Sequence, residues 1–253
     1  MALLIWGYAL VSVIVVSLLS FVGVLTLFVK GKKLRKLLLF LVSLSAGSLF
    51  GDAFLHLLPE TVTKEGFTIE VSLLVLLGVV VFFVLEKFIH WRHRHGVKST
   101  LSKGSRSHLA VLNLVGDGIH NFVDGLVIAG SYLVSVPVGM ATTFAVIFHE
   151  IPQEFADFGV LLYAGLSKGR ALFFNFLSAL TAVVGTLLGL LWGASSSSFV
   201  DLTLPFAAGG FLYIAGSNLI PELHKECRLK DSFSHLFAML LGIGLMVLLK
   251  VFG

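Results

Sequence analysis

The sequence predicts an all-α integral membrane protein with eight transmembrane helices and almost nothing outside the bilayer. Of its 253 residues, 57% are hydrophobic and only 13% are charged, and the mean hydropathy is +1.00. A soluble domain carries about 25% charged residues, because it needs polar surface to match its core. This composition therefore excludes an ordinary soluble enzyme.

Eight apolar stretches are each long enough to cross the hydrocarbon core, which takes about 20 residues in a helix. They are residues 6–29, 36–58, 69–91, 108–132, 137–163, 170–192, 202–223 and 233–252. The first stretch is too long for the apolar region of a signal peptide and ends in a basic cluster, so we interpret it as a spanning helix. The links are short, which predicts a single transmembrane domain over residues 1–253.

Basic residues concentrate in alternate links, after the first, third, fifth and seventh stretches. The clearest groups are Lys30 to Lys36, Lys87 to Arg106, Lys168 with Arg170, and Lys225 to Lys230. Cytoplasmic links carry an excess of lysine and arginine. We therefore expect a multi-pass protein of the cell membrane, with the basic links in the cytoplasm and both termini outside. Glu86 and Lys87 fit anchors at the membrane interface.

The second and seventh stretches share a sequence pattern. AGSLFGDAFLHLLPE at 46–60 aligns without gaps with AGGFLYIAGSNLIPE at 208–222, which pairs His56 with Asn218. Because the charge pattern orients the two helices in opposite directions, the match predicts an inverted repeat of helices 1–3 and 6–8 around helices 4 and 5. Such repeats are typical of transporters that alternate access around a midplane site. The alternative is chance recurrence of small residues at helix interfaces.

Ionisable side chains inside the membrane are costly and so mark function. On the fourth helix, a polar stripe within a sector of about 100° faces one way. On the fifth helix, a second stripe covers about 140°. The first stripe is Asn113, Asp117, His120, Asn121 and Asp124, and the second is His149, Glu150, Gln153, Glu154 and Asp157. Adjacent antiparallel helices would bring the two stripes together at mid-bilayer depth.

Imidazole and carboxylate groups suit Zn, Fe and Mn, so the facing stripes predict a divalent-metal site. Asp124 and Glu150 would balance the charge of the ion, and Pro152 would free the carbonyl of Phe148 beside it. Hydrogen bonds that only join helices are the alternative for these polar groups. A proton relay could also use the acids and histidines.

Two other function classes compete with metal transport. An intramembrane zinc protease would use HExxH, but Gln153 takes the place of the second histidine and Pro152 falls inside the motif. A proton-coupled carrier of an organic solute would not require histidine at both mid-bilayer positions. We therefore predict a transporter of metal ions and no enzyme. We expect divalent metal ions and the lipid bilayer as partners, and no nucleic acid.

The motifs HNFVDG at 120–125 and HEIPQE at 149–154, with GDAFLHLLPE at 51–60, resemble those of the ZIP family of divalent metal transporters. The resemblance covers nearly the whole chain and is closest to prokaryotic-type members whose second motif is of the form HEIPHE. It implies uptake into the cytoplasm of Zn2+, and of Fe2+, Mn2+ or Cd2+, as transported substrate with no prosthetic group. Carried over by position, the metal ligands would be His120, Asn121, Asp124, His149, Glu150 and Gln153.

The resemblance also implies a transport path on either side of the site. Asp52 and His56 would meet the metal as it enters, and we assign Asp117, Glu154, Asp157 and Asn218 to the rest of the path. His90, His93, His95 and His108 are candidates for handling metal on the cytoplasmic side, although for the first three we favour a basic flank that orients the helix. Gln153, Asn218 and Ala182 are neutral at positions where relatives of the family carry stronger or charged ligands. The negative charge available for a second metal is therefore lower, which predicts one main metal site. A homodimer remains open.

Overall fold

The computed structural model describes residues 2–27, 31–96, 103–196, 198–225 and 229–252, which form eight helical rods. In chain order the rods are α1 (Ala2–Leu18) continued by the 3-10 helix η1 (Leu19–Leu27); α2 (Gly31–Asp52) with η2 (Ala53–Leu57) and α3 (Leu58–Glu65); α4 (Ile69–Gly96); α5 (Lys103–Val134); α6 (Val136–Tyr163); α7 (Lys168–Ala179) with α8 (Thr181–Ser195); α9 (Ser198–Tyr213) with η3 (Ile214–Leu219) and α10 (Ile220–Leu223); and α11 (Leu229–Phe252). The prediction of an all-helical fold is confirmed for this part of the chain.

Six of these rods are long and apolar enough to cross a membrane: 3–25, 31–64, 69–87, 168–195, 198–223 and 231–252, counted over the described residues. The other two long helices are α5 and α6, which carry the polar stripes. Leucine, valine and phenylalanine side chains are widely exposed on the outer faces of the rods. Contact of such an apolar surface with lipid is favourable, whereas its exposure to water would be unfavourable.

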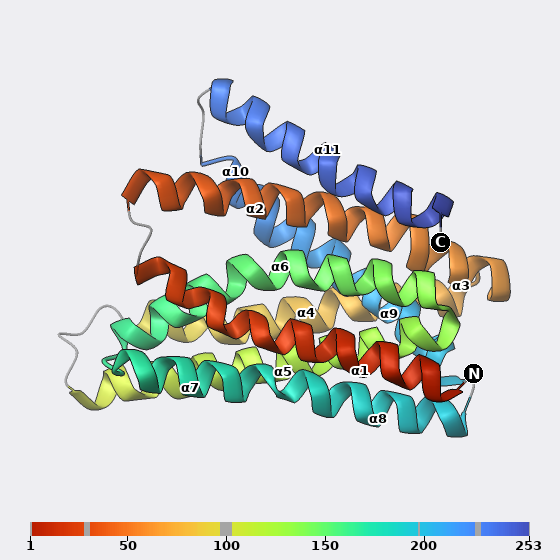
Figure 1. Ribbon diagram of the computed structural model, residues 1–253, viewed down its shortest axis with the longest axis horizontal. Helices are drawn as coiled ribbons and strands as arrows, with labels where there is room; N and C mark the ends of the chain where they lie inside the picture. Colours follow the sequence, from red (N-terminus) through yellow and green to blue (C-terminus); the bar gives the residue numbers. More distant parts are fainter. Residues whose placement is uncertain (1, 28–30, 97–102, 197, 226–228, 253) are drawn as a thin grey trace.

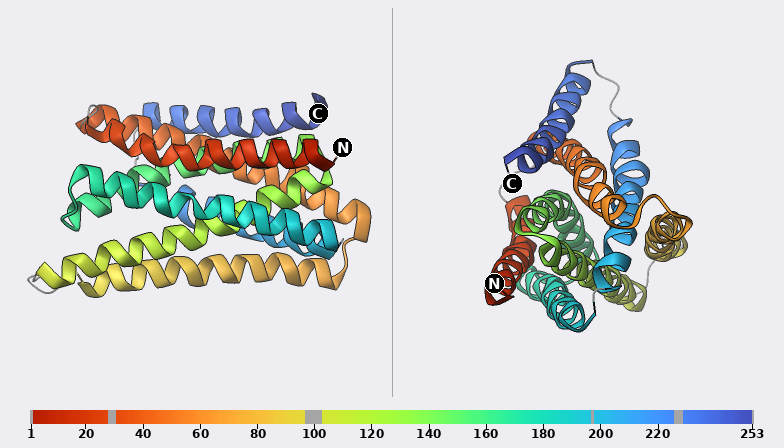
Figure 2. Two further views of the ribbon diagram at one scale, coloured as in Figure 1. Left: turned by 60° about the horizontal axis from the view of Figure 1, so that its bottom comes forward. Right: turned by 90° about the vertical axis from the view of Figure 1, so that its right-hand side faces the viewer.

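The rods lie roughly side by side, and both termini lie at one end of the bundle (Figure 1). The starts of α2, α5 and α7 lie at the opposite end, which is the end of the basic links. In the end-on view of Figure 2, α6 lies within the bundle, near α1 and α2. It contacts α1, α2, α5, α7 and α11. The fifth predicted helix is therefore packed on several sides by protein.

The two copies of the sequence repeat run antiparallel (Figure 1) and contain the same backbone irregularity. Both η2 and η3 are π-helices, closed by bonds from Leu58 N–H to the Ala53 carbonyl and from Ile220 N–H to the Ala215 carbonyl. These donors and acceptors are equivalent in the alignment of 46–60 with 208–222. A proline follows each donor residue. Because proline has no N–H for the carbonyl four residues earlier, a regular α-helical turn would lose a hydrogen bond there, which favours the wider π turn.

Backbone contacts repeat the same relation. An ideal Cβ placed on any of four glycines would come within 2.0–2.3 Å of a backbone carbonyl oxygen on the facing helix. The contacts are Gly47 with Met239 and Gly242 with Leu44, between α2 and α11, and Gly209 with Val75 and Gly78 with Phe206, between α9 and α4. Only glycine permits this approach. The helix pairs α2–α11 and α9–α4 therefore use equivalent glycines at equivalent positions.

Candidate metal site

The polar stripes of α5 and α6 face each other inside the bundle. Ser135 separates the two helices and its hydroxyl caps α6 by accepting from the Val138 N–H at 3.3 Å, so the chain turns back at once. On α5 the residues Asn113, Asp117, Asn121 and Asp124, and on α6 the residues His149, Glu150 and Glu154, are at most 6% exposed. The antiparallel juxtaposition that the stripes predicted is present.

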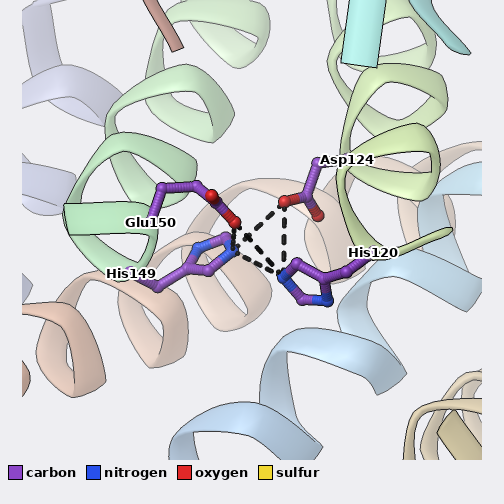
Figure 3. Close-up of side chains that lie close together, drawn as sticks. All are labelled: His120, Asp124, His149 and Glu150. Carbon is purple, nitrogen blue, oxygen red and sulfur yellow. Dashed lines mark hydrogen bonds and ion pairs between the residues drawn. The ribbon is translucent and has the colours of Figure 1, made fainter. Parts of the chain in front are cut away.

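Four of these side chains form one cluster (Figure 3), which we call the His/acid cluster: His120, Asp124, His149 and Glu150. The Nε2 atoms of the two histidines lie 3.2 Å apart. Asp124 Oδ2 lies 3.2 Å from His149 Nε2, and Glu150 Oε1 lies 3.4 Å from His120 Nε2. One donor atom from each of the four residues lies within 4.8 Å of all the others. Two nitrogens and two oxygens at this spacing suit a four-coordinate divalent metal.

The second nitrogen of His149 determines which atom faces the cluster. His149 Nδ1 lies 3.0 Å from the carbonyl oxygen of Ala145. A carbonyl only accepts, so Nδ1 carries the proton and donates it, which leaves the Nε2 lone pair directed at the cluster. Histidines that bind metals are commonly held by such a contact. His120 packs edge-on against Phe82, with ring centroids 5.8 Å apart.

The cluster contains carboxylate oxygens that protein donors do not saturate. Asp124 Oδ1 and Glu150 Oε1 are buried and have no hydrogen-bond partner among the described residues. A buried carboxylate without compensation is strongly unfavourable. Two such carboxylates beside two imidazole rings form an environment that a divalent cation would stabilise.

A group of carboxylates adjoins the cluster and shares Glu150 with it. Asp117, Glu150 and Glu154 offer oxygens within 4.8 Å of one another. Asn175 of α7 donates to Glu154. Asn175 was not among the predicted residues, although a lone asparagine in the apolar helix 168–179 was the signal that could have found it.

The two carboxamides predicted as ligands turn to Asp117 rather than to the His/acid cluster. Asn121 Nδ2 donates to Asp117 Oδ1 at 2.9 Å, and Gln153 Nε2 lies 3.4 Å from the same oxygen. Asn121 Oδ1 is buried without a hydrogen-bond partner among the described residues. The structure thus brings together four of the six predicted ligands and places the other two beside them, orienting a carboxylate.

Asp52 and His56 lie on α2 and η2, toward the end of the bundle that holds the termini. His56 Nδ1 lies 3.3 Å from Asp52 Oδ1, and Thr142 of α6 donates to Asp52 Oδ2 at 3.0 Å. Both residues of the pair are at most 1% exposed. Thr142 precedes His149 by about two helical turns, or about 10 Å. The pair is therefore separate from the His/acid cluster.

Ser45 of α2 satisfies the carbonyl that Pro152 was predicted to release. Its hydroxyl has one hydrogen, which lies between the Phe148 carbonyl and the Leu41 carbonyl of its own helix, the latter 2.8 Å away. Proline has no N–H to pair with the carbonyl four residues earlier, and its ring crowds that carbonyl. The contact ties α6 to α2 one residue before His149.

A cavity of about 200 Å3 adjoins His120 on the side of the basic links, and we call it the inner cavity. It contains most of the remaining predicted path residues. Its polar lining consists of Glu86, Asn113, Asp117, His120, Gln153, Asp157, Tyr213 and Asn218. Glu86, which the sequence suggested as an interface anchor, lines this cavity. The side chains of His90, His93, His95 and His108 lie outside the described part of the structure.

Known proteins resemble the chain along nearly its whole length. It matches the family model described as "ZIP Zinc transporter" over residues 3–109 and 92–250. It is 30% identical to a "Metal cation symporter ZIP14" of Xenopus tropicalis over 98% of this chain and 70% of the relative. It is 31% identical to a "Zinc transporter SLC39A7" of Canis lupus familiaris over 96% and 71%, and 35% identical to a "Zinc transporter ZIP13" of Pongo abelii over 84% and 66%. The chain is therefore a member of the ZIP zinc transporter family and a multi-pass membrane protein.

Proposed function

We propose that this chain moves divalent metal cations, chiefly Zn2+, across the cell membrane into the cytoplasm through the His/acid cluster. The observation that carries the proposal is the convergence of His120, Asp124, His149 and Glu150 within the bundle. Membership in a metal transporter family supports the class of activity. Mixed nitrogen and oxygen donors suit Zn2+, and they also accept Fe2+, Mn2+ and Cd2+.

The proposed route runs from the end with the termini to the end with the basic links. We take all eight rods as membrane spans of one unit over 1–253, with both termini outside. Metal would enter past Asp52 and His56, bind in the cluster and leave through the inner cavity. The burial of Asp52 and the cavity beside His120 support a state closed to the outside and wider on the cytoplasmic side. The antiparallel repeat supports alternating access.

The cluster would replace the hydration shell of the ion. Two carboxylates offset the double charge, and the imidazole lone pairs complete a four-donor set. Neutral Gln153 and Asn121 add no charge, so we propose one main metal in the cluster. The carboxylates of Asp117 and Glu154 would provide the next oxygens on the cytoplasmic side.

The structure favours transport over zinc-dependent hydrolysis. In a zinc protease motif of the form HExxH, the fifth residue binds the metal. Here that residue is Gln153, whose amide lies 3.4 Å from Asp117. Of the two histidine ligands of such a motif, only His149 is present in the cluster. Glu150 of the same helix lies among the donors, and the other two donors, His120 and Asp124, come from α5.

Zinc uptake into proteoliposomes tests the proposal. His149→Ala and Asp124→Ala each remove one donor, and we expect saturable uptake of radioactive zinc to fall by at least about tenfold. His235→Ala on α11 is the matched control and should retain uptake. Size-exclusion profiles check that each variant is folded.

Two results would contradict the proposal. Unchanged uptake in both cluster variants would place the ligands elsewhere. Absence of uptake by the native chain for Zn2+, Fe2+, Mn2+ and Cd2+ alike would revive the hydrolase and the organic-solute carrier.

A further inference from the structure

Glu86 of α4 is a carboxylate of the inner cavity that lies outside the His/acid cluster and its neighbouring acids. Two neutral donors from the seventh rod orient it. The Tyr213 hydroxyl donates to Glu86 Oε2. With its amide nitrogen turned toward α4, Asn218 donates to the same carboxylate at 2.7 and 2.9 Å. Both contacts fix the orientation of the carboxylate, and hydrogen bonds to a charged acceptor are stronger than neutral ones.

The same cavity also reaches the metal cluster. His120 lines it and so do Asp117 and Asn113, one and about two turns closer to the basic end of α5. At a rise of 1.5 Å per residue, Asp117 and Asn113 lie about 4.5 and 10.5 Å from His120 along the helix axis. The cavity therefore connects the cluster to Glu86 through polar side chains on α5.

Unsatisfied polar atoms line this connection. Asp117 Oδ2 and Asn113 Nδ2 have no hydrogen-bond partner among the described residues, and their residues are 3% and 6% exposed. Buried polar groups are normally paired with protein, water or an ion. A cavity of about 200 Å3 has room for several waters, at about 30 Å3 each. The lining thus suits a cation that carries part of its hydration shell.

We propose that Glu86, oriented by Tyr213 and Asn218, is the carboxylate that receives the metal cation when it leaves His120 and passes it to the cytoplasm. This inference rests on the proposed function. Beyond His120 the ion meets oxygen donors and water instead of imidazole. Zn2+ prefers sites that include nitrogen or sulfur, and it is held less tightly by oxygen alone, so each step toward Glu86 would ease release. An anion in the lining of the cavity stabilises the cation between the dry cluster and bulk solvent, where an unpaired charge would be costly.

Comparison of charge-removing and charge-retaining variants tests the role of Glu86. Glu86→Gln can accept the same hydrogen bonds from Tyr213 and Asn218 but lacks the charge. We expect the maximal rate of zinc uptake into proteoliposomes to fall about tenfold, with zinc affinity in equilibrium dialysis of the purified protein unchanged. Glu86→Asp should recover much of the rate. Tyr213→Phe removes one donor and keeps the carboxylate, so its rate should stay within about twofold of native.

A carboxylate at the other end of the bundle provides the matched control. Asp201 pairs with Lys64 there, and Asp201→Asn should leave the maximal rate unchanged. A native rate in folded Glu86→Gln would overturn the inference, because a purely structural role needs no charge. Lost zinc affinity in Glu86→Gln would overturn it as well, since the residue would then support the cluster itself.

Two further results separate the possible failures. If Glu86→Gln does not fold, Asn218→Lys places an ammonium group beside the same carboxylate and should slow uptake to a similar degree; a native rate in that variant overturns the inference. Absence of uptake by the native chain would refute the proposed function and this inference together. Normal native uptake with no effect of Glu86→Gln would refute the inference alone.

Discussion

The two copies of the repeat, α2–η2–α3 and α9–η3–α10, have equivalent backbones and different chemistry. Both contain a π-helix closed by equivalent bonds, and both approach a neighbouring helix through an equivalent glycine. The first copy carries Asp52 and His56 where the second carries Ile214 and Asn218. The repeat therefore accounts for helix shape and packing, whereas the polar chemistry is particular to each copy.

The difference extends to the partners of each copy. Asp52 accepts a hydrogen bond from Thr142 of α6 and is fully buried. Asn218 instead donates to Glu86 of α4, and both line the inner cavity. The first copy carries its own carboxylate, and the second binds a carboxylate supplied by its neighbour. The two ends of the proposed transport path would thus be built from related backbones with different donors.

The largest expected effect concerns the shared backbone. In Gly47→Ala and Gly209→Ala the new Cβ would lie 2.1 and 2.0 Å from a facing carbonyl oxygen, so the helices must separate. We expect each variant to lose about 1–3 kcal/mol or more of stability, seen as a lower temperature for loss of the monodisperse size-exclusion peak in detergent.

Gly244→Ala on α11 is the control, because a Cβ there meets nothing within 4 Å. Its transition should lie at or slightly above that of the native chain, because alanine favours a helix more than glycine does. If one of the two repeat glycines tolerates alanine and the other does not, the equivalence of the two helix pairs fails.

An intermediate effect is expected from the position where the copies differ most. Asp52→Asn keeps the size of the side chain and an acceptor for Thr142 but removes the charge. We expect the half-saturating zinc concentration to rise about tenfold with little change in maximal rate, as for a group that attracts the ion before it binds. Ile214→Val, at the equivalent site, should leave both constants unchanged and cost about 0.5–1.5 kcal/mol of stability. An equal effect of the two variants on transport would remove the distinction between the copies.

The smallest effect should come from the prolines that follow the π-helices. Pro59→Ala and Pro221→Ala restore an N–H that can pair with the carbonyl four residues earlier. Alanine stabilises a regular α-helix and removes the proline that favours the π turn. Because the side chains of the proposed path are unchanged, we expect uptake within about threefold of native in both variants. Hydrogen exchange measured by mass spectrometry over 53–58 and 215–220 reports the change of turn. A response in only one copy would show that tertiary contacts, rather than proline, maintain the π-helix in the other.

Much of the fold could be predicted because membrane helices satisfy their own backbone and show their length as apolar sequence. As far as the described residues extend, each of the eight predicted stretches lies in a helical rod; the first, 6–29, is described to residue 27. The positions of the polar stripes also followed from helical periodicity, since side chains three and four residues apart share a face. The predicted family is confirmed by the match to the family model.

Periodicity could not predict which way a side chain turns within its stripe. Asn121 and Gln153 lie on the predicted faces, but their amides hold Asp117 instead of joining the His/acid cluster. The place of Glu86 in the lining of the inner cavity and of Asn175 beside Glu154 was not predicted, for a related reason. Each is a single polar residue near the end or middle of an apolar helix, and its importance depends on which helix packs opposite.

Composition and apolar length were enough to predict a helical membrane protein, and the motifs predicted two histidines and two acids on neighbouring helices. These properties depend on composition and on the period of the helix, which are local. Only the tertiary structure decided that the four donors converge within 4.8 Å, that Ser45 satisfies the carbonyl before His149, and that Glu86 faces the same cavity as His120. Such contacts depend on the rotation and separation of helices that are distant in sequence, and those are decided by close packing at glycines throughout the bundle.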